Sequence, residues 1–294
     1  MEEGKDFVDL GGNTDIVLEE KKLTGKAEEK EVTIIPDCGL APGLVSVITR
    51  DIVDECSSVD SIHIRVGGVP LNPKPPFNYQ KVFSLEGLIN EYVEDAIVLE
   101  DGEIKYKKSL TKIERIVFPE PFGEMEAFIT SGGTSTLPYT YRGRIRNLDY
   151  KTIRYPGHCE KIKVLFDIGL GSNQPIDIDG FKVTPRKILV NLLDKTLPSK
   201  GEDAVLLRVA ARGEEDNKSV YYEYNMIDRY DMDTGLTAMM RTTGFPVAIT
   251  ADMIQRRVID RDGVFTPEEV IPPKPFFKEL EERDIRIDRE VTYE

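Results

Sequence analysis

The sequence is poor in the residues that build disulfide frameworks and structural metal sites. Its 294 residues include three cysteines, Cys38, Cys56 and Cys159, and two histidines, His63 and His158. An odd, scattered set of cysteines is typical of reduced thiols rather than of a disulfide scaffold. No Cys/His group has the spacing of zinc ligands. We therefore expect neither a disulfide framework nor a bound structural metal.

Positive charges are outnumbered by negative ones. The chain has 39 Lys and Arg against 53 Asp and Glu, which gives a net charge of −14. This balance argues against nucleic acid and against an anionic membrane surface as partners, although a few local arginines would suffice for a small anionic substrate. The sequence contains no apolar run long enough to span a bilayer, and Met1 leads into charged residues rather than into a secretory signal. We expect a cytoplasmic protein.

The glycine motif of dinucleotide-binding folds is absent from these residues. A strand followed by Gly-x-Gly-x-x-Gly would cradle the pyrophosphate, and the Gly11-Gly12 turn lacks the third glycine and the spacing. We therefore expect these residues to open inside a doubly wound pattern, without the half that normally holds the pyrophosphate.

The stretch Glu31–Ile52 organises the first part of the chain. Its residues 32–35 are apolar and β-rich, a Gly/Pro turn follows, and helical spacing of apolar residues begins after Pro42. Preceded by a short strand at 7–10 and a charged amphipathic helix over 15–30, this predicts a parallel β-α-β unit. Asp37 would lie at the carboxyl end of the strand, where open α/β sheets bind ligands. The alternative is that Asp37 only caps the turn.

The pattern changes after Ser61. Strands of alternating polarity, hairpins and long antiparallel strands predict a mixed sheet with helices on one side. The expected strands and hairpins lie at 62–66, 96–106, 113–118, 176–183, 204–211 and 219–228, and a helix is expected over 185–197. Near the end we expect helices over 234–241, 248–257 and 276–283 and an edge strand at 285–287. The fold class is therefore α/β: a partial Rossmann unit plus a larger α+β domain with a mixed sheet.

Three further stretches carry side chains suited to chemistry. Residues 130–136, TSGGTST, form either a flexible polar loop or a loop that surrounds a polar ligand with hydroxyl and backbone N–H groups. Arg142, Arg144 and Arg146 alternate and would share one face of a strand, either as a solvent face or as a carboxylate-binding stripe.

The turn at residues 151–158 brings Arg154, Tyr155 and His158 together before a helix over 159–170. The helix dipole would lower the pKa of His158 and keep the ring neutral. A structural and a catalytic role for His158 remain equally open.

Several long motifs in order resemble the saccharopine dehydrogenase family, most closely its saccharopine dehydrogenase-like and lysine 6-dehydrogenase-like branch: DLGGNTDIV, IPDCGLAPGLVSV, VGGVPLNPKPPFNYQKVFSLEGLINEY, KTIRYPGHCEKI and MMRTTGFP. The resemblance implies a Rossmann domain for NAD or NADP and a second domain for substrate and homodimer formation. It divides the chain into a Rossmann remnant at 1–45, rejoined by about 240–294, and a substrate-binding and dimerisation domain at 46–239.

The implied reaction is NAD(P)-dependent oxidation of a C–N bond of an amino acid in lysine metabolism. It needs a base for the amine and arginines for the carboxylates. The implied catalytic or orienting residues are Asp37 and His158. The implied substrate-binding residues are Arg154, Arg142, Tyr155 and Thr134. The implied wall beside the nicotinamide consists of Gly11, Gly12, Asn13, Thr14 and Gly39. Lysine, saccharopine and carboxynorspermidine-type substrates stay open, as does the alternative of a truncated, non-catalytic substrate and dimerisation module.

Overall fold

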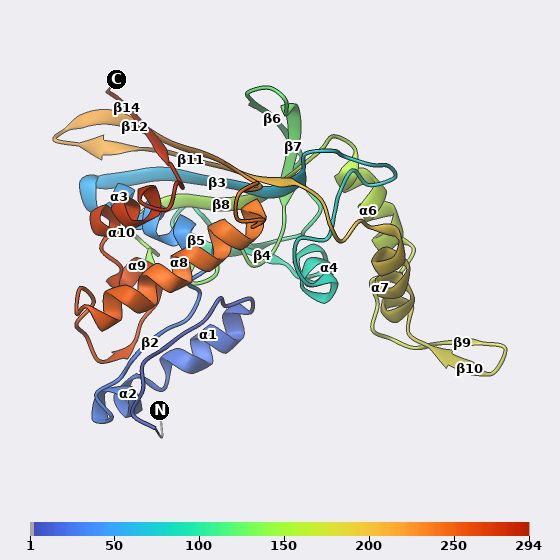
Figure 1. Ribbon diagram of the computed structural model, residues 1–294, viewed down its shortest axis with the longest axis horizontal. Helices are drawn as coiled ribbons and strands as arrows, with labels where there is room; N and C mark the ends of the chain where they lie inside the picture. The colour runs from blue at the N-terminus through green and yellow to red at the C-terminus, as the bar shows by residue number, and fades with distance from the viewer. Residues whose placement is uncertain (1–2, 294) are drawn as a thin grey trace.

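The chain builds two main β-sheets and a separate two-stranded hairpin, which are joined by helices (Figure 1). The computed structural model describes residues 3–293. The small sheet has the order β1-β2-β13, and the large one β14-β12-β11-β3-β8-β4-β5 with the β6-β7 hairpin attached to β8. This confirms the expected fold class, a small parallel unit beside a larger mixed sheet. None of the helices within residues 3–293 is both long and apolar enough to cross a membrane.

The small sheet is parallel throughout. Its strands are β1 (Phe7–Val8), β2 (Thr33–Ile35) and β13 (Gly263–Val264). The late part of the chain therefore returns to the first. The single helix expected over 15–30 is wrong, because two helices, α1 (Thr14–Lys21) and α2 (Thr24–Glu29), lie there. The break arises where the Thr24 hydroxyl bonds the Lys21 carbonyl at 2.7 Å.

The large sheet is mixed. Its strands are β3 (Ser58–Pro70), β4 (Ala96–Glu100), β5 (Glu103–Lys107), β6 (Glu114–Phe118), β7 (Gly123–Ile129), β8 (Ile145–Arg154), β11 (Asp203–Glu215), β12 (Lys218–Arg229) and β14 (Asp288–Tyr293). Strands β3 and β8 run parallel, and β11 pairs antiparallel with β3 and with β12. The edge strand was expected at 285–287; it lies at β14 and pairs with β12.

Helices cover one face of this sheet. In Figure 1, α3 (Leu44–Glu55), α8 (Ala238–Gln255) and α10 (Pro273–Glu281) lie beneath the end of the sheet that carries β11, β12 and β14. They bury the main core, to which α3 contributes Leu44, Ile48 and Ile52. The two helices expected around Pro246 form one continuous helix. Burial of one face of α8 outweighs the hydrogen bond that the proline removes.

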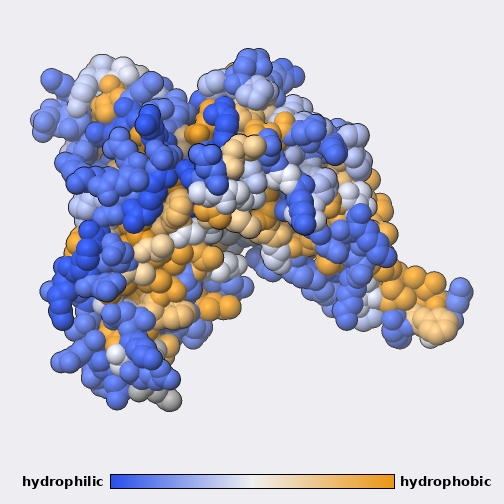
Figure 2. Space-filling view, in the orientation of Figure 1, coloured by the Kyte–Doolittle hydropathy of each residue, from blue (hydrophilic) through white to orange (hydrophobic). Residues whose placement is uncertain are grey.

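A second lobe projects from the opposite end of the sheet. It contains α4 (Leu85–Val93), α6 (His158–Asp167) and α7 (Pro185–Thr196), with the hairpin of β9 (Ile176–Ile178) and β10 (Phe181–Val183) extending beyond them (Figure 1). These helices share their own apolar cluster. Between the two lobes the surface is hollowed beneath the sheet (Figure 2).

Candidate functional site

Asp37 lies just past the carboxyl end of β2. Its backbone is in the left-handed region with φ of 64°, and its side chain is 1% exposed. The Ser135 hydroxyl donates to Oδ2 at 2.5 Å, whereas the buried Oδ1 has no hydrogen-bond partner among residues 3–293. A buried carboxylate oxygen without a partner is costly, so this atom is poised to meet a donor or a proton.

Burial raises the pKa of Asp37 from 3.8 to about 7. The hydrogen bond from Ser135 opposes this rise, and the negative charges of Glu268, Asp9 and Glu20 add to it. The pKa near 7 lets Asp37 gain and lose a proton at neutral pH, which is the property that a general base or acid needs.

The Gly11-Gly12 turn packs against Asp37. Gly11 has φ of 66°, and a Cβ placed on it would lie 1.7 Å from Asp37 Oδ1. Gly12 faces open space, and a Cβ on Gly39 would contact the Leu10 carbonyl oxygen at 3.6 Å. Two of the glycines expected beside a cofactor, Gly11 and Gly39, thus lie at the same strand end as Asp37.

Asn13 and Thr14 lie at the start of α1. The Asn13 side chain caps the helix by accepting from the backbone N–H groups of Asp15 at 3.0 Å and Ile16 at 3.2 Å, and Thr14 is the first helical residue. Asn13 therefore has a local structural task in addition to any contact with a ligand.

The hydroxyl-rich loop between β7 and α5 (Leu137–Thr140) is held at both ends. The Ser131 backbone N–H donates to the Glu91 carbonyl at 3.0 Å, and the Thr134 hydroxyl donates to the Ile97 carbonyl at 2.8 Å. At its other end Ser135 contacts Asp37, and Thr136 donates to Glu268 at 2.8 Å. The loop therefore connects the Asp37 site with α4.

Glu268, on α9 (Pro267–Val270), is the second carboxylate of the Asp37 site. Its Oε1 also accepts from the Thr140 hydroxyl at 2.8 Å, while its buried Oε2 has no partner within the described residues. The Thr130 hydroxyl is likewise buried and without a partner there. Together with Asp37 Oδ1, these atoms could still form hydrogen bonds, because no group of residues 3–293 is bonded to them.

Arg154 ends β8 and is 3% exposed. Its Nη1 donates to the Ile153 carbonyl at 2.8 Å and its Nε to the Tyr92 hydroxyl at 3.4 Å, and the guanidinium stacks over the Tyr79 ring at 4.9 Å. No carboxylate oxygen of residues 3–293 lies within 4.0 Å of it. Its positive charge is therefore not neutralised by a direct ion pair among these residues, which is unusual for a buried arginine.

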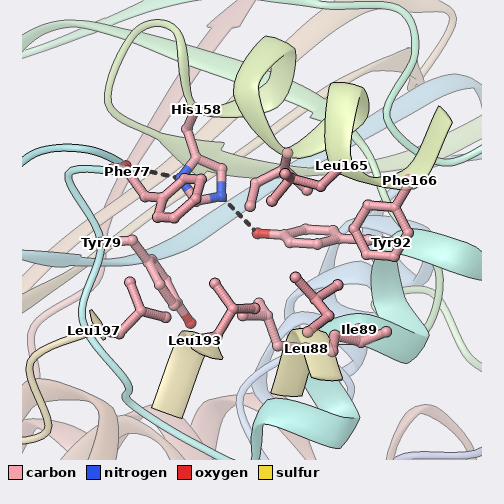
Figure 3. A pocket seen from close by; sticks show the side chains of 12 residues that line it. Phe77, Tyr79, Leu88, Ile89, Tyr92, His158, Leu165, Phe166, Leu193 and Leu197 are labelled. Atoms are coloured by element: carbon pink, nitrogen blue, oxygen red, sulfur yellow. Dashed lines mark hydrogen bonds between the residues drawn. The ribbon is translucent and has the colours of Figure 1, made fainter. Parts of the chain in front are cut away.

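His158 is the first residue of α6 and is 2% exposed. Its Nδ1 lies 2.9 Å from the Phe77 carbonyl, and its Nε2 lies 3.0 Å from the Tyr92 hydroxyl (Figure 3). Because a carbonyl only accepts, Nδ1 carries the proton and Nε2 accepts from Tyr92. Burial, together with the nearby charge of Arg154, lowers the pKa of His158 to about 3. Both ring nitrogens are occupied, and the ring is neutral.

The cavity beside His158 is small and apolar. Its volume is about 10 Å³, room for about one water molecule, and leucines and aromatic rings line it (Figure 3). His158 thus lies inside the packing of the second lobe. Its link to Arg154 runs through Tyr92, whose hydroxyl contacts both side chains.

Tyr155 and Arg142 lie apart from these contacts. The Tyr155 hydroxyl donates to the Pro70 carbonyl at 2.9 Å. Arg142 is exposed and pairs with Glu103 at 2.5 Å. The interpretation of Arg142, Arg144 and Arg146 as one strand face is wrong, because β8 begins only at Ile145 and the two preceding residues form a turn.

Two residues of the site were missed in the sequence. Ser135 belongs to the hydroxyl-rich loop, which was the available signal, but nothing in the spacing identified which hydroxyl meets Asp37. Glu268 is a single acidic residue among many. Ser135 becomes recognisable only by its contact with Asp37, and Glu268 only by its burial and by its Oε2 without a partner among residues 3–293.

The architecture and the site define a mixed α/β protein with a polar site at the carboxyl end of a parallel strand. The model of the saccharopine dehydrogenase C-terminal domain family matches residues 39–285, and the chain belongs to this family. The family resemblance expected from the motifs is therefore confirmed.

Two solved structures share the fold. Apo saccharopine dehydrogenase (L-Glu forming) from Saccharomyces cerevisiae matches with a TM-score of 0.74 and 19% identity, over 92% of this chain and 76% of that chain. The homospermidine synthase from Legionella pneumophila in complex with NAD matches with a TM-score of 0.61 and 14% identity, over 97% of this chain and 70% of that chain.

The residues present fit NAD(P) only in part. The Gly11-Gly12 turn leaves open space at Gly12 next to the buried Asp37, which suits the nicotinamide end. The pyrophosphate would need a glycine-rich strand-to-helix turn, and none of the 294 residues forms that motif. The negative charge of Asp9 adds to the raised pKa values of Glu20 and Asp37, and such a group of carboxylates is an unfavourable neighbour for a phosphate.

Proposed function

We propose that this protein acts as an amino-acid dehydrogenase of the saccharopine dehydrogenase or lysine 6-dehydrogenase type, which oxidises a C–N bond in lysine metabolism. The observation that carries the proposal is the buried guanidinium of Arg154, which has no carboxylate partner among residues 3–293. Such a group binds the carboxylate of an amino-acid substrate. Membership of the family and the pKa of Asp37 near 7 support the same reading.

Asp37 would accept the proton that the substrate amine must lose before the C–N bond is oxidised. Ser135 fixes the Asp37 carboxylate by a hydrogen bond, and Gly11 packs directly against its Oδ1. NAD(P) would supply the acceptor for the hydride that leaves the carbon, and the resulting imine would be hydrolysed by water. Tyr92 and His158 would position Arg154, because they form one hydrogen-bonded chain from the guanidinium to the Phe77 carbonyl.

The test is NAD(P)-dependent oxidation of L-lysine and of saccharopine by the purified chain and by Arg154→Ala. Loss of one partner of a buried charge pair should weaken substrate binding by about 2–5 kcal/mol, seen as a higher KM. The matched control is Arg146→Ala, an exposed arginine that pairs with Asp101. Equal effects of the two substitutions, or no oxidation of either substrate at any cofactor concentration, would contradict the proposal.

A second candidate is a non-catalytic module for substrate binding and homodimer formation. The absence of the glycine motif from these residues favours it. Titration with NADH, followed by fluorescence, separates the two candidates. We expect the chain alone to bind NADH weakly, with a Kd on the order of 1 mM, because none of these residues forms the glycine-rich strand-to-helix turn that would hold the pyrophosphate. In either case the three free thiols suit the cytoplasm that we propose as its location.

A further inference from the structure

A buried carboxylate on α9 holds the turn that follows the hydroxyl-rich loop. Glu268 is 3% exposed, and its Oε1 accepts hydrogen bonds from the hydroxyls of Thr136 and Thr140, both at 2.8 Å. Thr136 directly precedes the single turn of α5, and Thr140 is the last residue of that turn. Because hydrogen bonds to a carboxylate are roughly twice as strong as neutral ones, one oxygen atom fixes both ends of the turn.

Ser135 lies directly before this turn. Its hydroxyl donates to Asp37 Oδ2 at 2.5 Å, and neighbouring Cα atoms are ~3.8 Å apart, so Ser135 cannot move far while Thr136 is held. Both partners of this bond have left-handed backbones, with φ of 39° at Ser135 and 64° at Asp37. Residues other than glycine keep such a conformation only where the surrounding contacts enforce it. The hydrogen bonds to Glu268 supply this constraint on the side of the loop.

The other acidic groups that face Asp37 do not hold the loop. They are Asp9, which directly follows β1, and Glu20, on α1. Asp9 Oδ1 accepts from the backbone N–H groups of Gly11 at 2.6 Å and of Asp37 at 3.3 Å. Within the described residues, neither side chain is bonded to the hydroxyl-rich loop, so Glu268 alone of the three is connected to Ser135 through the chain.

We propose that Glu268 is a positioning residue for Asp37, which holds Thr136 and Thr140 so that the Ser135 hydroxyl stays on the Asp37 carboxylate. This inference rests on the proposed function, in which Asp37 accepts the proton of the substrate amine, and extends it with a residue that acts on this base through the loop. The negative charge of Glu268 has a separate effect, since it adds to the raised pKa of Asp37. Glu268→Gln separates the two effects, because an amide oxygen still accepts from both hydroxyls but carries no charge.

The experiment follows the titration of Asp37 by NMR of the aspartate side-chain carboxyl carbons, on the purified chain without cofactor or substrate. The Asp37 signal is assigned by its disappearance in Asp37→Asn. Ser135→Ala is then introduced into three backgrounds, which are the wild type, Glu268→Gln and Glu268→Ala. The effect of Ser135→Ala in each background measures how well the loop holds the hydroxyl on Asp37.

We expect Ser135→Ala to raise the pKa of Asp37 in the wild type, because it removes the hydrogen bond that lowers this pKa. The same rise should occur in Glu268→Gln, where the amide oxygen still holds the loop. Little further change should occur in Glu268→Ala, where the loop is already released. Glu281→Gln, an exposed glutamate at the end of α10, is the control and should behave as the wild type.

Where oxidation of a substrate is measured, Glu268→Ala should lower kcat by roughly 10- to 100-fold and change KM by less than about threefold, because a misplaced base slows the chemical step more than binding. Glu268→Gln should restore most of the lost kcat. If Glu268→Ala does not fold, Thr136→Val combined with Thr140→Val removes the same two hydrogen bonds from the side of the loop.

An equal rise in the pKa of Asp37 on Ser135→Ala in all three backgrounds, or no rise in the wild type, would overturn the positioning role. The expected pattern without NAD(P)-dependent oxidation of any substrate would instead count against the proposed function and leave the role of Glu268 standing. Oxidation that depends on Arg154 but is unaffected by Glu268→Ala would do the reverse.

Discussion

Ser135 donates a 2.5 Å hydrogen bond to Asp37, although 98 residues separate the two in the sequence. The contact joins the loop after β7, which belongs to the large sheet, to the end of β2 in the small one. It also sets the protonation behaviour of the site. Burial raises the pKa of Asp37, and this hydrogen bond keeps it from rising further.

Asp37→Asn should make the protein more stable at pH 8. Folding raises the pKa of Asp37 from 3.8 to about 7, so the wild type loses stability as the pH rises through this window, by up to about 4 kcal/mol. Asparagine cannot ionise, so the variant should not lose stability over this pH range. Urea unfolding at pH 4.5 and pH 8 measures the free energy of unfolding, with exposed Asp101→Asn as the control. A gain that is equal at both pH values would contradict the raised pKa.

His158→Gln should flatten the acid limb of the stability profile. Folding lowers the pKa of His158 from 6.5 to about 3, so the wild type loses stability as the pH falls below 6.5, by about 2 kcal/mol at pH 5. The glutamine variant should be less stable at pH 7.5, where it loses packing and hydrogen bonds, but should lack this additional loss. Exposed His63→Gln serves as the control.

The contributions of His158 and Asp37 have opposite signs between pH 4 and pH 6.5. They partly cancel in the wild type, so each is best measured with the other group substituted. If the Asp37→Asn variant shows no loss of stability on acidification from pH 6.5 to pH 5, the inference that the buried His158 ring is neutral is wrong.

Gly11→Ala should destabilise the protein by about 2–4 kcal/mol. The new methyl group would collide with Asp37 Oδ1, 1.7 Å away, in addition to the strain at φ of 66°. Gly102→Ala is the matched control: its φ is 78°, and it has no atom within 4 Å of the added Cβ, so only the backbone strain of about 1 kcal/mol applies. Equal losses of stability would show that Gly11 is needed for its conformation alone.

Phe181→Ser should reduce self-association. Ile176, Ile178 and Phe181 lie exposed on the β9–β10 hairpin, and Phe181 is 74% exposed. An isolated two-stranded sheet is marginal in water, so we expect a second copy to cover this surface in the homodimer proposed for the substrate domain. Sedimentation velocity compares Phe181→Ser with Met232→Ser, whose residue is also 74% exposed. A monomeric wild type at high concentration would contradict this expectation.

The sequence by itself determined the elements whose signals are local. The parallel β-α-β opening, the hairpins around Asp101-Gly102 and Asp179-Gly180 and the strand-to-helix turn that ends in His158 each follow from turn residues and apolar periodicity within a few positions. The motifs likewise identified the family, because long stretches of sequence carry that information directly.

Only the tertiary structure decided how these elements continue and which atoms meet. Pro246 does not end α8, since burial of the helix outweighs the lost hydrogen bond, a term that depends on distant neighbours. Ser135 pairs with Asp37, both nitrogens of His158 are occupied, and Arg154 has no carboxylate partner among the described residues. Each of these is a contact, or a missing contact, between residues far apart in the chain. Local propensity cannot predict these contacts, because burial and hydrogen-bond partners exist only once the chain has folded.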